Sequence, residues 1–415
     1  MKTREKAFLA ALRLPTQRRY EVEESLDELT RLAESAGADV VGRVTQERRA
    51  PTPALYFGKG KVEEIKTLSQ RERADLMIAD DPLSPIQERN LGGSLGLRVI
   101  DRTALILDIF AQRARTMEGK LQVELAQLSY LLPRLVGQWK HLERLGGGIG
   151  TRGPGEQQIE SDRRIIRNRI RKISSELGRV RVHRRLLRTR RKASGVPVVA
   201  LVGYTNAGKT TLLNRLTGSS LTAKDQLFVT LDPAARLVSI PPHAPFVLTD
   251  TVGFIKKLPH QLVAAFKATL EELAEADLLI HVVDASHPGL DEQVAAVESL
   301  LTELELSERP TIVALNKVDR LESDAAVRGL QQRWNGVSIS ARTGLGIDQL
   351  LARIGAGWEP RVERVALFIP YSDGTALALC YDKGRVLARS DEGEGIRLVV
   401  ELPRRLVAQL STYRT

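Results

Sequence analysis

Five short motifs occur in a fixed order along the chain, and their residue types suit the binding and hydrolysis of a nucleoside triphosphate. In chain order they are Gly203-Tyr204-Thr205-Asn206-Ala207-Gly208-Lys209-Thr210, Thr230, Asp250-Thr251-Val252-Gly253, Asn316-Lys317-Val318-Asp319 and Ser340-Ala341. Each motif alone is a weak signal, because short patterns also occur by chance. Together, in this order, they predict a domain that binds GTP and hydrolyses it.

The first motif is predicted to hold the phosphate groups. An apolar run at 198–202 predicts a strand before it, and a helix is predicted to begin near Lys209, which is the context that a phosphate-binding loop requires. Backbone N–H groups of the loop and of the helix N-terminus bind anions. Lys209 is expected to reach the β- and γ-phosphates, and Thr210 to place its hydroxyl on Mg²⁺. The alternative, a glycine-rich turn without function, is disfavoured by the motifs that follow.

Two later segments are predicted to respond to the γ-phosphate. Thr230 is expected to close on Mg²⁺ and the γ-phosphate and to be released after hydrolysis; a surface threonine is the alternative. Asp250 ends an apolar run and is expected to hold Mg²⁺ through water, while the Gly253 N–H contacts the γ-phosphate. The predicted metal ligands are Thr210, Thr230 and Asp250, and the predicted catalytic residues are Lys209, Thr230 and Gly253.

The last two motifs are predicted to select guanine. Asp319 can accept hydrogen bonds from guanine N1–H and the exocyclic amine, whereas adenine offers neither donor there, and such a site can reject the wrong base by ~10⁴-fold. Lys317 is expected to cover the base, Asn316 to tie this loop to the phosphate loop, and the Ala341 N–H to meet guanine O6. The predicted nucleotide-binding set is Gly203, Tyr204, Thr205, Asn206, Ala207, Gly208, Lys209, Thr210, Thr211, Phe228, Val229, Thr230, Asp250, Thr251, Val252, Gly253, Asn316, Lys317, Asp319, Ser340, Ala341 and Arg342.

The residue after Asp-x-x-Gly bears on the rate of hydrolysis. Many GTPases have a glutamine there that orients the attacking water, but this chain has Phe254, which has no hydrogen-bonding group. We therefore expect slow intrinsic hydrolysis, with the water positioned by the backbone and Thr230 or by a partner.

Composition narrows the class of protein. The chain has 415 residues, of which 42% are hydrophobic, and this length predicts about two to four domains. No stretch approaches the ~20 apolar residues that span a bilayer, and the charged N-terminus has no run like a signal sequence. The one cysteine, Cys380, excludes an internal disulfide and points to a reducing compartment. We expect a cytoplasmic monomer without membrane insertion.

Basic charge is concentrated in one segment. Residues 161–192 contain fourteen Arg or Lys and two acidic residues, a net charge of +12, whereas the whole chain carries +11. Such one-sided charge predicts a surface that binds a polyanion such as RNA. A solvated helix face is the alternative, but such faces usually mix both signs of charge.

The patterning predicts a multidomain α/β chain with four parts. They are an N-terminal α/β domain at 1–105, an antiparallel helical hairpin at 106–193, a GTPase domain at 194–358 and a small C-terminal α/β domain at 359–415. Near-continuous apolar runs at 198–202, 246–249, 278–283, 311–315 and 337–339 predict a mostly parallel sheet with helices on both faces.

Shorter patterns predict the elements of the two terminal domains. In the N-terminal domain we expect a helix capped by Ser25 that runs to Ala36, helices from near Gly60 and from Ser84-Pro85, and strands at 40–44, 76–79 and 97–100. In the C-terminal domain we expect strands at 365–369, 376–380, 385–388 and 396–400.

A heptad-like seam predicts the hairpin. From about 102 to 136 the pattern is helical, with Leu121, Leu125, Leu128, Leu132 and Leu135 stepping by four and three. The seam continues with Ile166, Ile170, Ile173, Leu177, Val180 and Leu187. Between the two runs, the glycine-rich segment 146–155 cannot be regular helix and predicts the tip, although a mere connector is the alternative.

The chain resembles the HflX-type GTPases of the Obg–HflX group. The resemblance covers nearly the whole chain and is carried by Gly58-Lys59-Gly60-Lys61, 121–128, the loop 146–155 running into Glu156, 228–233 and 250–254. Val229 stands where alanine is usual, and this residue is not a ligand. Asn206 resembles the asparagine with which some related GTPases hold K⁺ near the phosphates; an asparagine that only shapes the loop is the alternative. Equal rates in K⁺ and Na⁺ would contradict a K⁺ site.

The resemblance implies a GTPase that binds the large ribosomal subunit through rRNA and splits stalled or idle ribosomes. Its hairpin would enter the ribosome near the peptidyl transferase centre with the glycine-rich loop leading, and DNA is not an expected partner. The candidate RNA-contact residues of the hairpin are Gly147, Gly148, Arg152, Arg163, Arg164, Arg167 and Arg171.

Two other functions stay open on the sequence. One is an RNA-remodelling ATPase whose N-terminal domain binds a second nucleotide, with 58–61 as a phosphate or RNA contact instead of a helix-start turn. Retained ATP hydrolysis after Lys209→Ala would favour it. The other is an assembly factor for the large subunit, which association with precursor particles alone would favour.

Overall fold

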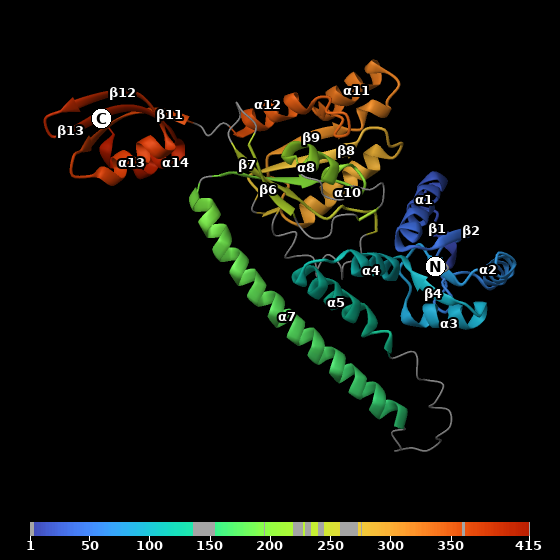
Figure 1. Cartoon of the computed structure of the whole chain (residues 1–415). Coiled ribbons are helices and arrows are strands. Elements are labelled where there is room, and N and C mark those ends of the chain that lie inside the picture. The colour runs from blue at the N-terminus through green and yellow to red at the C-terminus, as the bar shows by residue number, and fades with distance from the viewer. Residues whose placement is uncertain are drawn as a thin grey trace. The chain divides into compact units, whose positions relative to one another are not determined.

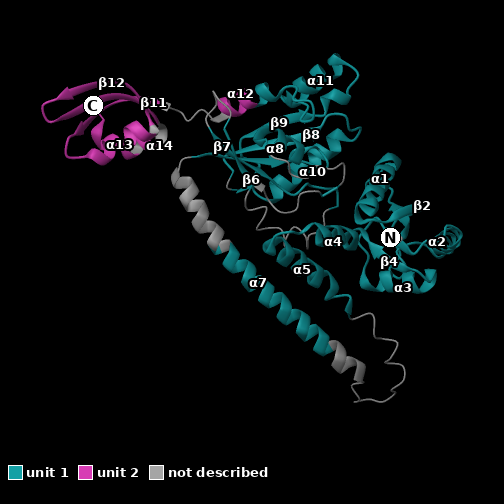
Figure 2. Cartoon of the chain, in the orientation of Figure 1, with its two compact units in different colours: residues 1–350 teal, residues 351–415 magenta. Residues whose placement is uncertain are grey.

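The computed structural model consists of two compact units, residues 1–350 and 351–415 (Figure 2). It describes residues 4–135, 154–194, 196–218, 227–228, 234–239, 245–257, 273–274, 276–358 and 362–414. The predictions for Gly147, Gly148, Arg152, Val229 and Thr230 concern residues outside these ranges.

The first element of the chain is a buried strand that the sequence did not predict. Strand β1 (Lys6–Arg13) pairs in parallel with β2 (Asp39–Glu47) and β3 (Leu76–Ala79), and β3 pairs in parallel with β4 (Arg98–Asp101), which gives the order β2-β1-β3-β4. Successive β1 side chains alternate between two cores. Leu9 packs with helix α1 (Arg19–Ala36) and helix α4 (Arg102–Arg113), whereas Phe8 packs with α2 (Lys59–Arg71) and α3 (Pro85–Leu95).

The helix boundaries of this domain correct one expectation and confirm another. Helix α1 begins at Arg19, so Ser25 lies inside the helix and does not cap it; its buried hydroxyl donates to Asp80 at 2.7 Å. Ser84 does cap α3, where its side chain accepts from the Gln87 N–H at 3.3 Å and Pro85 takes the first helical position.

The middle region is a helical hairpin, but its first arm is not one long helix. Helix α4 packs on the N-terminal sheet, and α5 (Met117–Leu131) starts anew after Thr116, whose side chain accepts from the Gly119 N–H at 3.0 Å. The predicted seam positions Leu132 and Leu135 therefore lie beyond the end of α5.

The second arm is α7 (Pro154–Ser194), which runs antiparallel to α5 (Figure 1). Leu121 forms a buried cluster with Ile173 and Leu177, while Glu124, further along α5, pairs with Arg169, earlier in α7, at 2.6 Å. Between these two contacts the residue number rises along α5 and falls along α7, so the two helices run antiparallel. The seam therefore forms at the predicted positions Leu121, Leu125, Leu128, Ile173 and Leu177. Helix α7 already begins within the glycine-rich segment, at Pro154.

A six-stranded sheet follows in the order β10-β9-β8-β5-β7-β6 (Figure 1). All its pairings are parallel except that of the edge strand β6 with β7, and β6 was not predicted. The strands are β5 (Val198–Val202), β6 (Ala234–Val238), β7 (Phe246–Asp250), β8 (Leu278–Asp284), β9 (Thr311–Asn316) and β10 (Val337–Ser338). The helices are α8 (Lys209–Thr217), α10 (Leu290–Glu303), a 3₁₀ turn η2 (Val318–Arg320), α11 (Asp324–Trp334) and α12 (Ile347–Trp358).

The C-terminal unit holds a three-stranded antiparallel sheet in the order β11-β13-β12. Its elements are β11 (Val362–Pro370), α13 (Gly374–Lys383), β12 (Arg385–Glu392), β13 (Gly395–Pro403), α14 (Arg404–Gln409) and η3 (Ser411–Tyr413). The strand predicted at 376–380 is wrong, because this run lies within α13. Asp373 caps that helix by accepting from the Ala376 N–H at 3.0 Å, and Ala376 and Cys380, one turn apart, both face the core.

Candidate functional site

The loop between β5 and α8 has a backbone that only glycine permits at two points. Gly203 (φ 150°) lies against the Val282 carbonyl, and Gly208 (φ 98°) lies against the side-chain amide of Asn316, so a Cβ at either position would clash. Helix α8 begins directly after Gly208, which places its free N-terminal N–H groups at the loop. This is the geometry of an anion-binding site.

Lys209 lies at the centre of this loop. Its side chain is buried, and its ammonium donates to the carbonyl oxygens of Gly203 at 3.0 Å and Tyr204 at 2.8 Å. Burial lowers the pKa of Lys209 to about 8, although nearby Asp250 opposes that shift. The ammonium is thus a poorly solvated cation for which a phosphate group would be a strong partner.

Two of the three predicted metal ligands are in contact. The Thr210 hydroxyl donates to Asp250 Oδ2 at 2.8 Å, and the other carboxylate oxygen accepts from the Thr251 N–H at 3.0 Å. Hydroxyl and carboxylate oxygens are the hard ligands that Mg²⁺ prefers, so these residues fit the ion. The third predicted ligand, Thr230, lies outside the described residues.

The segment after Asp250 is paired with the phosphate loop. The Phe254 N–H donates to the Gly203 carbonyl at 3.1 Å, and the Thr205 N–H donates to the Phe254 carbonyl at 2.7 Å. This pairing brings Gly253 so close to Lys209 that a Cβ on Gly253 would lie 3.1 Å from the Lys209 ammonium. The Phe254 side chain is buried among the apolar residues of the sheet core, so it takes no part in orienting water.

Asn316 connects the predicted base-recognition motif to the predicted phosphate loop. Its side-chain amide donates to the Ala207 carbonyl at 2.7 Å, and its side-chain oxygen accepts from the Ala341 N–H at 2.9 Å. The Ala341 N–H expected to meet guanine O6 thus has a protein partner here. Asp319 Oδ2 accepts from the Arg342 guanidinium at 2.9 Å, so both groups would exchange partners to contact guanine.

Asp284 is a candidate site residue that no sequence motif marks. It ends β8, beside the end of β9, and accepts from the Lys317 ammonium at 2.7 Å. Burial alone would raise its pKa, but the hydrogen bonds from Lys317 and Ser286 hold the pKa of Asp284 below its ordinary value. A charged residue at the carboxyl end of a buried parallel strand was the available signal.

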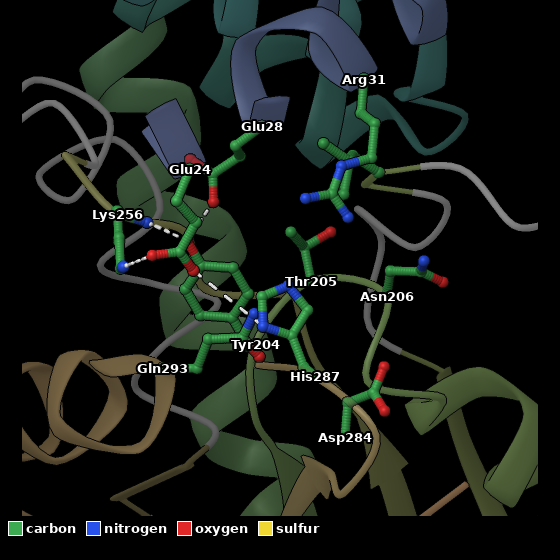
Figure 3. Close-up of a pocket in the computed structure, with 11 residues that line it drawn as sticks. Glu24, Glu28, Arg31, Tyr204, Thr205, Asn206, Lys256, Asp284, His287 and Gln293 are labelled. Atoms are coloured by element: carbon green, nitrogen blue, oxygen red, sulfur yellow. Dashed lines mark hydrogen bonds and ion pairs between the residues drawn. The ribbon is translucent and has the colours of Figure 1, made fainter. Parts of the chain in front are cut away.

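The N-terminal domain packs directly against the phosphate loop, which was also not predicted. The Phe110 and Phe228 rings meet edge to face with centroids 4.6 Å apart. The Tyr204 hydroxyl donates to Glu28 of α1 and accepts from the Lys256 N–H at 2.7 Å (Figure 3). Burial and the Glu28 carboxylate raise the pKa of Tyr204, so its phenol stays protonated.

A buried ion network supports this contact. Arg102 is 1% exposed and donates to Asp80 and Glu28, both at 2.5 Å. Lys257, four residues after Gly253, pairs with Asp80 at 2.5 Å and adopts a positive φ of 56°. Burial would raise the pKa of Asp80, but Arg102 and Lys257 hold it at about 2. The network therefore connects the N-terminal sheet to the segment that follows the γ-phosphate motif.

The predicted RNA-contact residues that are described lie on α7. Arg164, Arg167 and Arg171 are exposed, while Arg163 is half-buried. Arg163 and Arg167 both approach Glu160, at 3.8 and 3.4 Å. The segment 58–61 forms the start of α2, with Gly58 as its N-terminal cap residue, which is the helix-start turn that the sequence analysis kept as an alternative.

Comparison with known proteins places the whole arrangement in one family. Residues 23–111 match the family model for the GTP-binding GTPase N-terminal domain, 113–191 that for the GTP-binding GTPase middle region, and 198–317 that for the 50S ribosome-binding GTPase. The GTPase HflX of Caldanaerobacter subterraneus is 48% identical, covering 95% of this chain and 91% of its own. That of Escherichia coli is 47% identical, covering 92% and 90%.

The chain belongs to the HflX family of GTPases. It is therefore a GTP hydrolase with a ribosome-binding type of GTPase domain, as the resemblance implied. The multidomain α/β class expected from the sequence is also confirmed. None of the helices that the structure describes is long and apolar enough to cross a membrane.

Proposed function

We propose that this GTPase binds the large ribosomal subunit in its GTP form and separates ribosomes into subunits. The observation that carries the proposal is the hairpin, whose second helix concentrates a net charge of +12 between 161 and 192 and exposes Arg164, Arg167 and Arg171. Arg side chains on one surface supply sequence-independent affinity for RNA phosphates. The match of 198–317 to 50S ribosome-binding GTPases supports the same partner.

Within the GTPase domain we assign roles from the geometry. Lys209 and the N–H groups at the start of α8 hold the phosphates, Thr210 and Asp250 hold Mg²⁺, and the Gly253 N–H meets the γ-phosphate. Mg²⁺ supplies positive charge that offsets the charge developing on the phosphates. Because Phe254 is buried, the attacking water is positioned by backbone groups, by Thr230 or by the ribosome.

The base and the counter-ion are assigned in the same way. Asp319 recognises guanine, beside Lys317 and the Ala341 N–H; displacement of bound fluorescent GTP by GTP but not by ATP tests this. We also propose that Asn206, which lies on the phosphate loop with φ 61°, helps to hold K⁺. Equal hydrolysis rates in K⁺ and Na⁺ would contradict it. A cytoplasmic location follows from the proposed partner.

Ribosome splitting is tested by light scattering and sucrose gradients of intact ribosomes. We expect GTP with the full chain to convert intact ribosomes to subunits, and GDP to leave them intact. Lys209→Ala should abolish the GTP effect, because the phosphate cation is lost. Intact ribosomes that stay intact while the chain associates only with precursor particles would contradict splitting and support the assembly role.

A further inference from the structure

Helix α1 of the N-terminal domain turns one face toward the GTPase domain. Four residues of this face make contacts across the boundary: Tyr20 with Glu292 at 3.3 Å, Glu24 with Lys256 at 2.8 Å, Glu28 with the Tyr204 hydroxyl, and the Ser35 hydroxyl with the Leu227 N–H at 3.4 Å. Their spacing of four, four and seven residues is that of one helix face.

Arg31 fills the missing position of this face, between Glu28 and Ser35. Glu28, one turn before Arg31, contacts Tyr204 of the phosphate loop. Ser35, one turn after Arg31, contacts Leu227, which lies three residues before Thr230. Arg31 therefore faces the space between these two parts of the nucleotide site. Figure 3 shows its side chain extending from α1 toward Thr205 and Asn206.

That space is a cavity of about 520 Å³ between α1 and the GTPase domain. Arg31 lines it together with Asn206 of the phosphate loop, Asp284, and Lys317 of the base-recognition motif. Because the cavity touches both the phosphate loop and the base motif, it borders the path that a nucleotide would take between them. Glu34 lines the same wall, which leaves Arg31 as the residue of α1 there that attracts an anion.

The Arg31 guanidinium is free to take a ligand as far as the described residues show. Within them it makes one hydrogen bond, from Nε to the Asp27 carbonyl of its own helix at 3.3 Å, and no ion pair. The side chain is exposed, so binding a ligand would not require a buried contact to break. A guanidinium offers a planar pair of N–H donors that matches phosphate oxygens.

We propose that Arg31 binds a phosphate group of the guanine nucleotide, so that the N-terminal domain supplies a cation to the site in the same chain. The proposal rests on the nucleotide site described above and adds a residue that lies outside the GTPase motifs. The contact of Glu28 with Tyr204, one helical turn before Arg31, would hold Arg31 at the phosphate loop.

The test compares Arg31→Ala with Arg19→Ala in the full chain. Arg19 lies on the same helix, is exposed and pairs locally with Glu23 at 2.9 Å, off the face that meets the GTPase domain. We expect Arg31→Ala to weaken GTP and GDP binding by about tenfold or more, because a charged hydrogen bond is lost, and Arg19→Ala to change it by less than about twofold. Arg31→Lys should fall between, since it keeps the charge but not the paired donors.

Binding of guanosine, measured in the same way, shows whether Arg31 contacts the phosphates or the nucleoside. Its affinity should be the same in Arg31→Ala and the unaltered chain, because it has no phosphate. Equal loss for guanosine and GTP, or no loss for any ligand, would overturn the proposal. Unchanged thermal unfolding of Arg31→Ala verifies the fold. If the unaltered chain failed to bind GTP, the proposed nucleotide site would be wrong. If the unaltered chain and Arg31→Ala bound GTP equally well, only the inference about Arg31 would fail.

Discussion

At the scale of single residues, the burial of Lys209 bears most directly on the proposed binding of phosphate. The ammonium has two backbone carbonyls as partners and a pKa lowered to about 8. A bound phosphate adds negative charge next to it and should raise that pKa. The charged form is therefore worth more in the nucleotide complex than in the free protein.

This difference predicts a pH dependence of GTP affinity. A group whose pKa is higher in the complex favours binding below its free-state pKa and loses that contribution as the pH rises above it. GTP affinity should thus be constant below about pH 8 and fall by up to about tenfold per pH unit above it. Fluorescent-nucleotide titrations at a series of pH values measure this, with guanosine as the control for ionisation of the base. A constant GTP affinity across this range would contradict the prediction.

The sequence suffices to name the candidate site residues that lie in continuous motifs. Lys209, Asp250 and Asn316 were predictable because the chemistry of each is set by neighbours a few positions away. It did not predict the contact of Glu28 with Tyr204 or the place of Arg31 beside Asn206 in one cavity, because these neighbours are more than a hundred residues later in the chain and no local pattern marks them. Residues that join two domains depend on packing, which a single sequence does not specify.

At the scale of elements, the seam between α5 and α7 holds the hairpin together. Ile173 is fully buried there against Leu121 and Leu177, while Ile165, two turns earlier on α7, is 64% exposed. The two isoleucines have the same side chain on the same helix, so they form a matched pair. Burial alone distinguishes them.

Ile173→Ala should lower the free energy of unfolding of the unit that contains the hairpin by ~2–4 kcal/mol, because it leaves a cavity in the seam. Ile165→Ala should change it by less than ~0.5 kcal/mol. Denaturant unfolding followed by circular dichroism measures both. Equal effects of the two substitutions would show that the seam does not form in solution.

The prediction of helices and strands failed where a short apolar run suits both the strand period and the helix period. The run 376–380 suits a strand by composition, but the Asp373 cap and the one-turn spacing of Ala376 and Cys380 make it helix. Strand β1 was missed because its alanine-rich run has low strand propensity, and its place at the centre of the sheet overrides that preference. The heptad seam was predicted correctly because its pattern persists over several turns.

At the scale of the whole molecule, two functions meet in one chain. The compact unit of residues 1–350 holds both the basic hairpin and most of the GTPase domain, and the N-terminal domain contacts the segment after Gly253 through Lys256 and Lys257. A partner bound by the hairpin and a nucleotide bound by the GTPase domain can therefore influence one another through direct contacts. This arrangement supports the proposal that binding of the large ribosomal subunit changes the GTPase activity.

The decisive measurement is GTP hydrolysis with and without purified large ribosomal subunits, at about 50 and 200 mM salt. We expect stimulation of about tenfold or more at low salt and its loss at high salt, because the proposed contact is to RNA phosphates. Arg164→Glu with Arg171→Glu on α7 should abolish the stimulation, whereas the control pair Arg71→Glu with Arg328→Glu, exposed elsewhere, should keep it. A hydrolysis rate that large subunits leave unchanged would contradict the central claim that the ribosome activates this GTPase.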